Sequence, residues 1–468
     1  MPHTSIHLTC PGAAAPANAA MSAMLLLLLF LALPVLPARG GEPRRPVHLE
    51  LARVDALVSA NLTDNELLRR AVLRSLDRPA RVGAAASSSS VGRKAAAAEA
   101  PLLAGGGEYL VKLGIGTPQH YFSAAVDTAS DLVWMQCMPC VSCYRQLDPV
   151  FNPKFSSSYA VVPCGSDTCD QLTDHRCRDE GEENACEYTY RYSGNAETKG
   201  TLAMDKLSIG GDVFHGIVFG CSDASVGGPP ALASGIVGLG RGPLSLVSQL
   251  SVRRFMYCLP PPLSRSAGRL VLGADAGAVR NVSDRVTVSM SSNPRYPSYY
   301  YLNFDGLAVG DRTPRRAQLS GNLNVTSPAT VRGRADAHGM IVDIASTITF
   351  LEESLYEELA DDLEEEIRLP RGSSSRLGLD LCFILPDGVG MDRVYVPAVS
   401  MSFDGRWLEM ERDRLFVEDR GMMCLMIGKT TGNVSILGNY QQQNMQVLYN
   451  LRRGKITFAK TSCESYGR

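Results

Sequence analysis

Two aspartates, Asp127 and Asp343, lie in matching sequence contexts and are candidates for acid-base chemistry. Each ends an apolar run and enters a turn of small residues, Asp127-Thr-Ala-Ser130 in the first and Asp343-Ile-Ala-Ser346 in the second. Apolar runs stopped by such turns predict strands with an aspartate at the end. Two aspartates brought face to face do not both ionise easily, so one keeps a proton while the other acts as a base. The pattern predicts hydrolytic chemistry if the two turns meet.

A second pair of motifs indicates that they do meet. Gly235-Ile-Val-Gly238 and Ser435-Ile-Leu-Gly438 are apolar strands stopped by glycine. The aspartates are 343 − 127 = 216 residues apart and the terminal glycines 438 − 238 = 200. Similar offsets for two independent motifs predict a duplicated lobe. Each aspartate loop should then lie beside a glycine-stopped strand, near a pseudo-two-fold axis.

The elements that must position the aspartates are mostly strands. Alternating apolar residues followed by Gly and Pro predict a hairpin at 108–118, and the run at 122–126 predicts the strand that carries Asp127. A longer hairpin is predicted at 186–202, with Ser-Gly-Asn at its tip, and such a hairpin could close over a cleft. In it, at least two of the tyrosines at 188, 190 and 192 are expected to fill a sheet face.

Two helices are predicted in this part of the chain. The segment 244–250 is a short one. The segment 352–367 is longer and has Leu355, Leu359, Leu363 and Ile367 on one stripe. Its acidic residues are expected to form a solvated face and no second catalytic cluster.

Composition limits the function classes. The chain has 468 residues, 45% of them hydrophobic, a net charge of −2 and a pI near 6.4. It can therefore bury a large core, and it lacks the positive charge that nucleic acid binding requires. The apolar run Met24–Leu36 is too short to span a bilayer comfortably and is followed by small residues, which predicts a cleaved secretory signal over 1–40. A retained membrane anchor is the alternative, since no Lys or Arg precedes the run.

The segment 41–103 is basic and ends in an Ala/Ser-rich run, and it is interpreted as a pro-segment. Within it, 64–76 has helical periodicity, with Thr63 as N-cap and Leu67, Leu68, Val72 and Leu73 on one side. The hypothesis is that its cations cover an acidic cleft near neutral pH and leave when the carboxylates protonate. A solvated linker without a role is the alternative. The two lobes are predicted at 104–290 and 291–468.

The cysteines agree with export. Cys10 falls in the leader, and the even number of remaining cysteines is what a disulfide framework requires. They are Cys137, Cys140, Cys143, Cys164, Cys169, Cys177, Cys186, Cys221, Cys258, Cys382, Cys424 and Cys463. The close triplet at 137, 140 and 143 lacks the neighbours that would complete a metal site, so no metal is expected. Glycosylation sequons begin at Asn61, Asn281, Asn324 and Asn433.

From about Glu108 to Cys463 the chain resembles the pepsin-like aspartic proteases, and specifically the plant nepenthesin-like branch. The resemblance rests on the following motifs: Gly114-Ile-Gly-Thr-Pro118, Asp127-Thr-Ala-Ser-Asp-Leu-Val-Trp134, the cysteine triplet, Phe151-Asn-Pro153, Tyr192, Phe219-Gly-Cys221, Gly238-Leu-Gly-Arg-Gly-Pro-Leu-Ser245, Asp380-Leu-Cys382-Phe383 and Ile436-Leu-Gly-Asn-Tyr-Gln-Gln-Gln-Asn444.

The resemblance implies a mostly β, bilobal fold with the active-site cleft between two related lobes. It implies catalysis by Asp127 and Asp343 without a cofactor, a flap tyrosine at Tyr192, and supporting hydroxyls from Thr128, Ser130 and Ser346 that orient the carboxylates. It further implies a monomer that acts on protein or peptide substrates at acid pH. Such a protein is secreted to the extracellular space (apoplast) or reaches the vacuole, without binding nucleic acid or stably associating with membranes.

The resemblance also implies six disulfides. By analogy they would join Cys137 to Cys140, Cys143 to Cys221, Cys164 to Cys186, Cys169 to Cys177, Cys258 to Cys463 and Cys382 to Cys424.

The chain departs from the family pattern beside both aspartates. Ala129 and Ala345 replace glycines that let the loops approach closely. Ile344 replaces a hydroxyl residue that bonds across to the other lobe, and its loss could leave a buried acceptor unpaired at about 1–3 kcal/mol. Two hypotheses follow: an acid-active endopeptidase, or a catalytically weak or inactive member that binds protein or glycan targets, as the xylanase-inhibitor relatives do.

Overall fold

The computed structural model describes fourteen stretches of the chain, all within one compact unit. They are residues 46–54, 63–76, 109–178, 184–192, 196–227, 233–261, 264, 266–273, 284–294, 296–310, 315–316, 339–372, 377–430 and 434–464. The predicted signal, the asparagines of the four sequons, the Ala/Ser-rich run and the hairpin tip at 193–195 lie outside the described residues.

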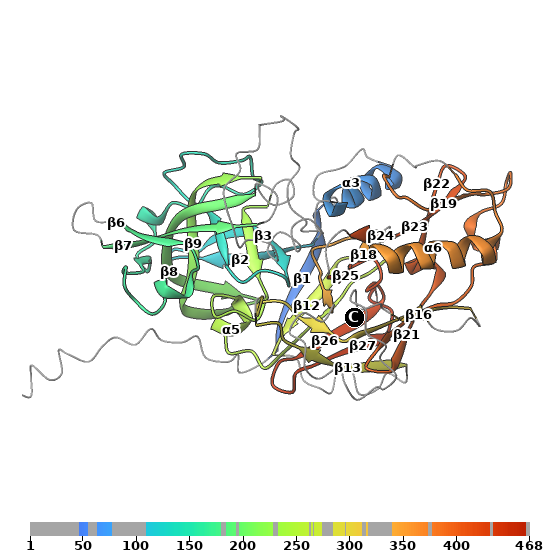
Figure 1. The fold of residues 1–468 in the computed structure, drawn as a ribbon. Coiled ribbons are helices and arrows are strands. Elements are labelled where there is room, and N and C mark those ends of the chain that lie inside the picture. Colours follow the sequence, from blue (N-terminus) through green and yellow to red (C-terminus); the bar gives the residue numbers. More distant parts are fainter. Residues whose placement is uncertain are drawn as a thin grey trace, which may run out of the picture. The chain divides into compact units, whose positions relative to one another are not determined.

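The described chain is mostly strands (Figure 1). The first half contains β1 Val47–Arg53, β2 Tyr109–Ile115, β3 His120–Asp127, β4 Trp134–Gln136, β5 Ala160–Val161, β6 His175–Arg178, β7 Ala185–Arg191, β8 Glu197–Ile209, β9 Asp212–Val226, β10 Gly235–Gly238, β11 Arg254–Cys258, β12 Gly268–Leu272 and β13 Arg285–Ser291. The second half contains β14 Tyr301–Leu302, β15 Phe304–Val309, β16 Arg315–Arg316, β17 Met340–Val342, β18 Thr349–Glu352, β19 Cys382–Ile384, β20 Val399–Phe403, β21 Arg406–Met410, β22 Phe416–Asp419, β23 Met422–Leu425, β24 Ile427–Thr430, β25 Ser435–Leu437, β26 Met445–Asn450 and β27 Lys455–Lys460. The helical elements are α3 Asp64–Leu76, α5 Leu246–Gln249, α6 Glu353–Ile367 and the 3₁₀ turns Pro153–Phe155, Cys169–Gln171, Met391–Arg393 and Arg412–Arg414.

The predicted repeat is confirmed by the strand pairing around the two aspartates. In the first half β3 runs parallel to β10, with Asp127 opposite Gly238. In the second half β17 runs parallel to β25, with Val342 opposite Leu437. Each aspartate-bearing strand therefore lies beside its glycine-stopped strand. The β2–β3 hairpin predicted from the Gly/Pro turn is also present.

A further sheet joins the two halves of the chain. Its strands follow the order β1, β12, β11, β26, β27 and β13 and are all antiparallel to their neighbours. Strands β26 and β27 come from the end of the chain, and β1 comes from the basic N-terminal segment (Figure 1). Strand β1 also pairs through its last residues with β2. The described residues 46–54 of the N-terminal segment therefore take part in this sheet.

The helix predictions hold with two exceptions. In α6 the stripe of Leu355, Leu359, Leu363 and Ile367 is buried as predicted. Helix α3 spans the predicted residues, and the Thr63 hydroxyl accepts a hydrogen bond from Glu66 N at 3.3 Å as an N-cap does. One exception is Leu73, which was assigned to the apolar side of α3 but is exposed. The other is Asp362, which was assigned to the solvated acidic face of α6 but is buried.

Two of the six predicted disulfides are confirmed, Cys258–Cys463 and Cys382–Cys424. The other four pairings were wrong. The structure instead joins Cys137 to Cys221, Cys140 to Cys143, Cys164 to Cys177 and Cys169 to Cys186.

The strand register and burial explain the corrections. Strand β4 runs parallel to β9 with Gln136 opposite Ser222, and this brings Cys137 beside Cys221. Cys169 and Cys186 are both completely buried and pair in the core, whereas Cys177 lies in the exposed strand β6. Sequence spacing carries no information on either point.

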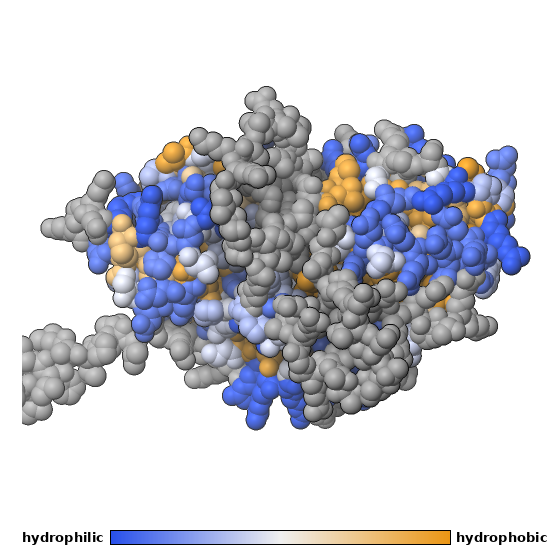
Figure 2. All heavy atoms as spheres, viewed as in Figure 1, coloured by the Kyte–Doolittle hydropathy of each residue, from blue (hydrophilic) through white to orange (hydrophobic). Residues whose placement is uncertain are grey.

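The surface seen in Figure 2 is largely hydrophilic among the described residues, with scattered apolar patches. One apolar patch lies over α3, where Leu73 and Leu76 are exposed. In the part of the chain that the structure describes, no helix is both long and apolar enough to cross a membrane.

Candidate active site

The two aspartate loops meet through one threonine. Asp127 ends β3 and Asp343 follows β17, and both side chains are buried. The Thr128 hydroxyl donates to Val342 O at 3.1 Å and accepts a hydrogen bond from Ile344 N, also at 3.1 Å. Thr128 therefore binds the backbone on both sides of Asp343, and the loops are joined as the sequence predicts.

The alanines beside the aspartates are accommodated. Ala129 N donates to Asp127 Oδ1 at 2.8 Å, and Ala345 N donates to Asp343 Oδ1 at 2.9 Å. Neither alanine has a positive φ, so neither needs a backbone conformation that only glycine adopts readily. The N–H donors that a glycine would supply are kept, and each fixes one oxygen of its aspartate.

Glycine is required at positions 238 and 438, where the two glycine-stopped strands end against the aspartate loops. A Cβ on Gly238 would lie 2.3 Å from Asp131 O, and one on Gly438 would lie 2.3 Å from Ile348 O. Beyond these glycines, Leu239 N donates to Asp127 O at 2.8 Å and Asn439 N donates to Ser346 O at 2.6 Å. The close crossing lets the backbone of each strand hold the loop above it.

Ile344 is the position at which the second aspartate loop differs from the first, which has Thr128 there. Its side chain is completely buried and its carbonyl oxygen accepts a hydrogen bond from Asn439 Nδ2 at 2.8 Å. Its apolar side chain has no hydroxyl, so it cannot make a hydrogen bond to the first loop that would correspond to the one Thr128 makes to the second. Of the corresponding side chains at 128 and 344, that of Thr128 bonds the opposite loop and that of Ile344 does not.

Tyr192 lies at the end of the β7–β8 hairpin and contacts the first lobe. Its hydroxyl accepts a hydrogen bond from Trp134 Nε1 at 2.7 Å. Burial raises the pKa of Tyr192 well above its ordinary value, and the proximity of Tyr190 and Asp127 adds to the effect. The Tyr192 hydroxyl therefore stays protonated across the acid range, and it can donate to a ligand while it accepts from Trp134. Tyr188 is buried among apolar side chains and fills a sheet face, as predicted for most of these tyrosines.

The three predicted supporting hydroxyls differ in what they contact. Thr128 acts on the backbone of the opposite loop, as described. Ser346 Oγ donates to Ile348 O at 3.1 Å. Ser130 Oγ is buried and hydrogen-bonds no group in the described residues, so the expected contact with a carboxylate is not formed.

Helix α3 packs directly on the second aspartate loop, which the sequence did not indicate. Ser75 Oγ lies 3.1 Å from Ser346 Oγ and accepts a hydrogen bond from Ile348 N at 3.1 Å. Thr347 Oγ1 donates to Ala71 O at 3.1 Å. The segment 346–348 is thus covered by the helix. Serine and alanine residues such as Ser75 and Ala71 occur in many settings, so the sequence does not predict such a contact.

Asp131 is a buried carboxylate that the sequence analysis did not single out. Its Oδ1 accepts a hydrogen bond from Gly242 N at 2.8 Å, and its Oδ2 accepts one from the Ser298 hydroxyl. Burial raises the pKa of Asp131 above its usual range, and the negative charge of Asp127 adds to this, although the two hydrogen bonds oppose it. The residue therefore ties the first aspartate loop to the segment that leads into the second half.

Asp131 should make the fold more stable in acid. Because its pKa is raised in the folded state, its contribution is complete below the unfolded pKa of about 4 and is lost as the pH rises through the folded pKa. Asp131→Asn is neutral at every pH, so the fall in Tm between pH 4 and pH 7 should be smaller in this variant than in the unsubstituted protein. The exposed Asp212→Asn is the control. Equal falls in all three proteins would contradict the expectation.

Comparisons with known proteins agree with this geometry. A family model described as "Xylanase inhibitor N-terminal" matches residues 109–274, and "Xylanase inhibitor C-terminal" matches residues 299–460. The chain is 61% identical to Aspartyl protease 37 of Oryza sativa subsp. japonica, over 94% of the chain and 98% of the relative. It is 36% identical to aspartic proteinase nepenthesin-1 of Nepenthes gracilis, over 89% of the chain and 90% of the relative. The chain belongs to the pepsin-like plant aspartic proteases.

The fold of the family is confirmed independently by solved structures. Basic 7S globulin from soybean matches with a TM-score of 0.60 at 17% identity, over 90% of this chain and 99% of that one. Conglutin gamma from lupine seeds matches with a TM-score of 0.59 at 16% identity, over 91% of this chain and 97% of that one. At such identities the likeness establishes the mostly β, bilobal pepsin-like fold. As a family member, the protein is placed among aspartic-type endopeptidases by its more similar relatives.

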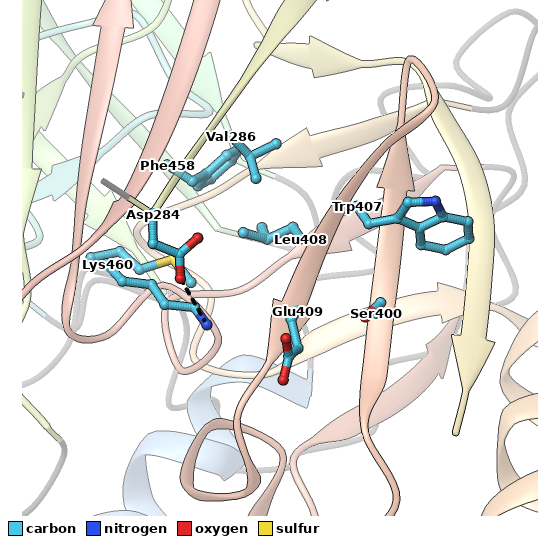
Figure 3. A pocket seen from close by; sticks show the side chains of 9 residues that line it. Asp284, Val286, Ser400, Trp407, Leu408, Glu409, Phe458 and Lys460 are labelled. Atoms are coloured by element: carbon cyan, nitrogen blue, oxygen red, sulfur yellow. Dashed lines mark ion pairs between the residues drawn. The ribbon is translucent and has the colours of Figure 1, made fainter. Parts of the chain in front are cut away.

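A separate pocket of about 160 Å³ lies between β13 and β21 (Figure 3). Trp407 and Glu409 come from β21, and the charged residues Asp284 and Lys460 pair at 3.2 Å on its other side. None of the residues of the aspartate loops lines this pocket. Among the described residues, no cluster of three or more His, Cys, Asp or Glu side chains is arranged to hold a metal ion.

Proposed function

We propose that this protease is secreted and hydrolyses peptide bonds of proteins at acid pH, with Asp127 and Asp343 activating one water molecule between them. The observation that carries the proposal is the Thr128 hydroxyl, which bonds Val342 O and Ile344 N and so joins the two aspartate loops. Two carboxylates on loops joined in this way can act on one substrate bond.

The reaction follows from the two protonation states. The ionised aspartate takes a proton from the water, and the oxygen of that water attacks the peptide carbonyl carbon. The protonated aspartate donates its proton to the carbonyl oxygen, which gives a tetrahedral diol. Collapse of the diol with proton transfer to the nitrogen releases the amine. The N–H groups of Ala129 and Ala345 keep one oxygen of each carboxyl in place while protons move on the others.

Acid pH is required because the pair must share one proton. Pepsin, the well-known example of such a dyad, works with its two aspartates in this state. An aspartate pair that has lost its shared proton has no acid left to protonate the carbonyl oxygen. Activity should therefore fall as the pH rises toward neutrality.

We further propose that 41–103 is an inhibitory pro-segment. Its described parts support this in two ways: β1 is paired in the shared sheet, and α3 covers 346–348 beside Asp343. Helix α3 is held by the buried apolar side chains of Leu68 and Val72 and also buries Arg74. We infer that a substrate reaching Asp343 displaces this helix, because α3 covers the residues that follow it.

A charge on the buried side of α3 should release the proposed inhibition by the pro-segment. Val72→Asp puts a carboxylate at a completely buried position, where it is strongly disfavoured while ionised. We expect the full-length variant to cleave a fluorogenic peptide at pH 5 to 6 before any self-processing is visible on a gel, whereas the unsubstituted chain lags. Leu73→Asp, on the exposed side of the same helix, should keep the lag. A lag of equal length in all three proteins would disprove the inhibitory role of α3.

The proposed activity itself is tested with the purified full-length chain. After acidification we expect self-processing and cleavage of globin, both blocked by pepstatin. If pepstatin binds but no turnover occurs across the acid range, the proposal is wrong, and a binding function for protein or glycan targets takes its place. Secretion is tested by expression with the native N-terminus in plant cells, with the protein expected in the apoplastic fluid or the vacuole and sensitive to deglycosylation.

A further inference from the structure

The Asp131 carboxylate occupies a space that two glycines leave open. A Cβ on Gly240 would lie 2.4 Å from Asp131 Oδ1, and one on Gly242 would lie 2.2 Å from Asp131 Oδ2. Neither glycine has a positive φ, so the close approach of the carboxylate, and not the backbone conformation, excludes a side chain at both positions. The segment 240–242 is thus shaped around the carboxylate that follows the first aspartate loop.

Two hydrogen bonds hold this carboxylate, and they come from different parts of the chain. Gly242 N donates to Asp131 Oδ1 at 2.8 Å, and the Ser298 hydroxyl donates to Asp131 Oδ2. Gly242 follows β10, whereas Ser298 lies between β13 and β14 and is 167 residues beyond Asp131. The carboxylate therefore connects the first aspartate loop to the stretch of chain that leads into the second half.

That stretch is itself fixed to the segment after β10. Arg241 N donates to Ser298 O at 3.0 Å, and Arg241 Nη1 donates to Ser291 O at 3.0 Å. Tyr300 is completely buried, and its hydroxyl donates to Leu239 O at 2.7 Å. Because Ser298 is held in this way, the hydroxyl that it presents to the carboxylate has a defined position.

The backbone of Asp131 contacts the β7–β8 hairpin. Asp131 N donates to the hydroxyl of Tyr190, which lies on β7, at 3.2 Å. The ring of Tyr190 is centred 5.1 Å from that of Tyr192, whose hydroxyl accepts from Trp134 Nε1. Asp131 thus contacts the hairpin with its backbone and the segment that leads into the second half with its side chain.

We propose that Asp131 is a positioning residue that fixes the first aspartate loop between the β7–β8 hairpin and the segment that leads into the second half. Its carboxylate takes no part in the proposed proton transfers, so it acts through Asp127, four residues before it, and through Tyr190. The contact with Ser298 holds in both protonation states, since a protonated carboxyl can donate to the Ser298 oxygen. The effect on catalysis rests on the proposed function, whereas the positioning of the loop does not.

The kinetic test compares two variants that remove the contact between Asp131 and Ser298 with one that keeps it. In the full-length chain after acid processing, Asp131→Ala and Ser298→Ala should each lower kcat at least about tenfold, because the first aspartate loop loses the contact that locates it. Asp131→Asn should stay within about threefold of the unsubstituted protein, because its amide oxygen can accept from Gly242 N while its amide nitrogen donates to Ser298 Oγ. Rates are taken per site titrated with pepstatin, so that unfolded protein does not count.

Ser158→Ala is the matched control. It also removes a serine hydroxyl that donates to an aspartate, Asp205 at 2.6 Å, and we expect it to lower Tm and leave kcat unchanged. If Ser298 served stability alone, its alanine variant would behave in the same way, and this result would overturn the proposal. Equal losses of kcat in Asp131→Asn and Asp131→Ala would overturn it too. Should Asp131→Ala fail to fold, the comparison of the two serine variants decides.

Tryptophan fluorescence tests the positioning without any activity. The chain has two tryptophans, so Trp407→Phe leaves Trp134 alone. Trp134 is buried and bonds Tyr192, and acrylamide quenching of its emission therefore reports on the packing beside the β7–β8 hairpin. In this background Ser298→Ala should raise the quenching constant at least about twofold, because weaker local packing opens more often, and Ser158→Ala should leave it unchanged.

The two measurements separate the failure of the proposal from the failure of the proposed function. An unchanged quenching constant in Ser298→Ala would overturn the positioning of the loop. Should the unsubstituted chain fail to cleave globin while the constant rises in Ser298→Ala alone of the two serine variants, the proposed function fails and the positioning stands.

Discussion

Asp343→Asn is expected to abolish proteolysis while leaving the fold intact. The amide oxygen of asparagine can still accept the hydrogen bond from Ala345 N, so the loop keeps its local geometry. An amide neither gives up nor takes a proton at acid pH, so the acid-base step is lost. We expect kcat to fall by at least about 10³-fold, within the range for removal of a general acid-base group. The measurement is single-turnover cleavage of a fluorogenic peptide, with self-processing followed on a gel.

The matched control is Asp205→Asn. Asp205, like Asp343, is a buried carboxylate, but it lies in the N-terminal half. It accepts hydrogen bonds from the hydroxyls of Ser156 and Ser158. Loss of this carboxylate should lower Tm and leave kcat of the folded fraction unchanged. A residual rate above a tenth of normal in Asp343→Asn would contradict the dyad mechanism.

Removal of the Cys258–Cys463 disulfide is expected to destabilise the protein more than removal of any short-range bridge. It closes a loop of 205 residues and fixes the end of the chain to β11, in the sheet shared by the two halves. Chain-entropy arguments predict that the double replacement with alanine lowers the free energy of unfolding by about 5 kcal/mol. The measurement is guanidinium unfolding under non-reducing conditions.

The Cys140–Cys143 bridge provides the comparison, because its cysteines are only 3 residues apart. The same argument predicts a loss of about 2 kcal/mol for the corresponding double alanine variant. Equal losses for the two bridges would show that strain or local packing, and not loop length, decides their contributions.

The repeat and the aspartate loops could be predicted from the sequence because their signals are local. An apolar run that ends at Asp127 or Gly238 predicts a strand and its end, and similar offsets indicate that the pattern occurs twice. The contacts between the halves then follow from the symmetry. The same argument did not locate Ser75 over Ser346, since a serine on a helix carries no information about its partner.

The disulfide pairing and the contact between Tyr257 and Gln442 could not be predicted from the sequence for another reason. Cys169 and Cys186 pair because both are in the core, and burial within a cysteine-rich stretch has no periodic signature. Tyr257 and Gln442 are 185 residues apart and meet only after β11 has paired with β26. A weak signal did exist: the run Gln441-Gln-Gln443 follows a buried strand, where polar side chains need partners.

Strand β1 has a consequence for what cleavage of the chain produces. Its backbone is paired with β12 from Val47 to Leu51, and Val47, Leu49, Leu51 and Val54 are buried. None of these contacts depends on the peptide bonds that connect β1 to the rest of the protein. A cut between 77 and 108 therefore yields a protein of two polypeptides, shorter on a denaturing gel but unchanged in native mass. Cutting and dissociation are separate events, and a shift in gel mobility reports only the first.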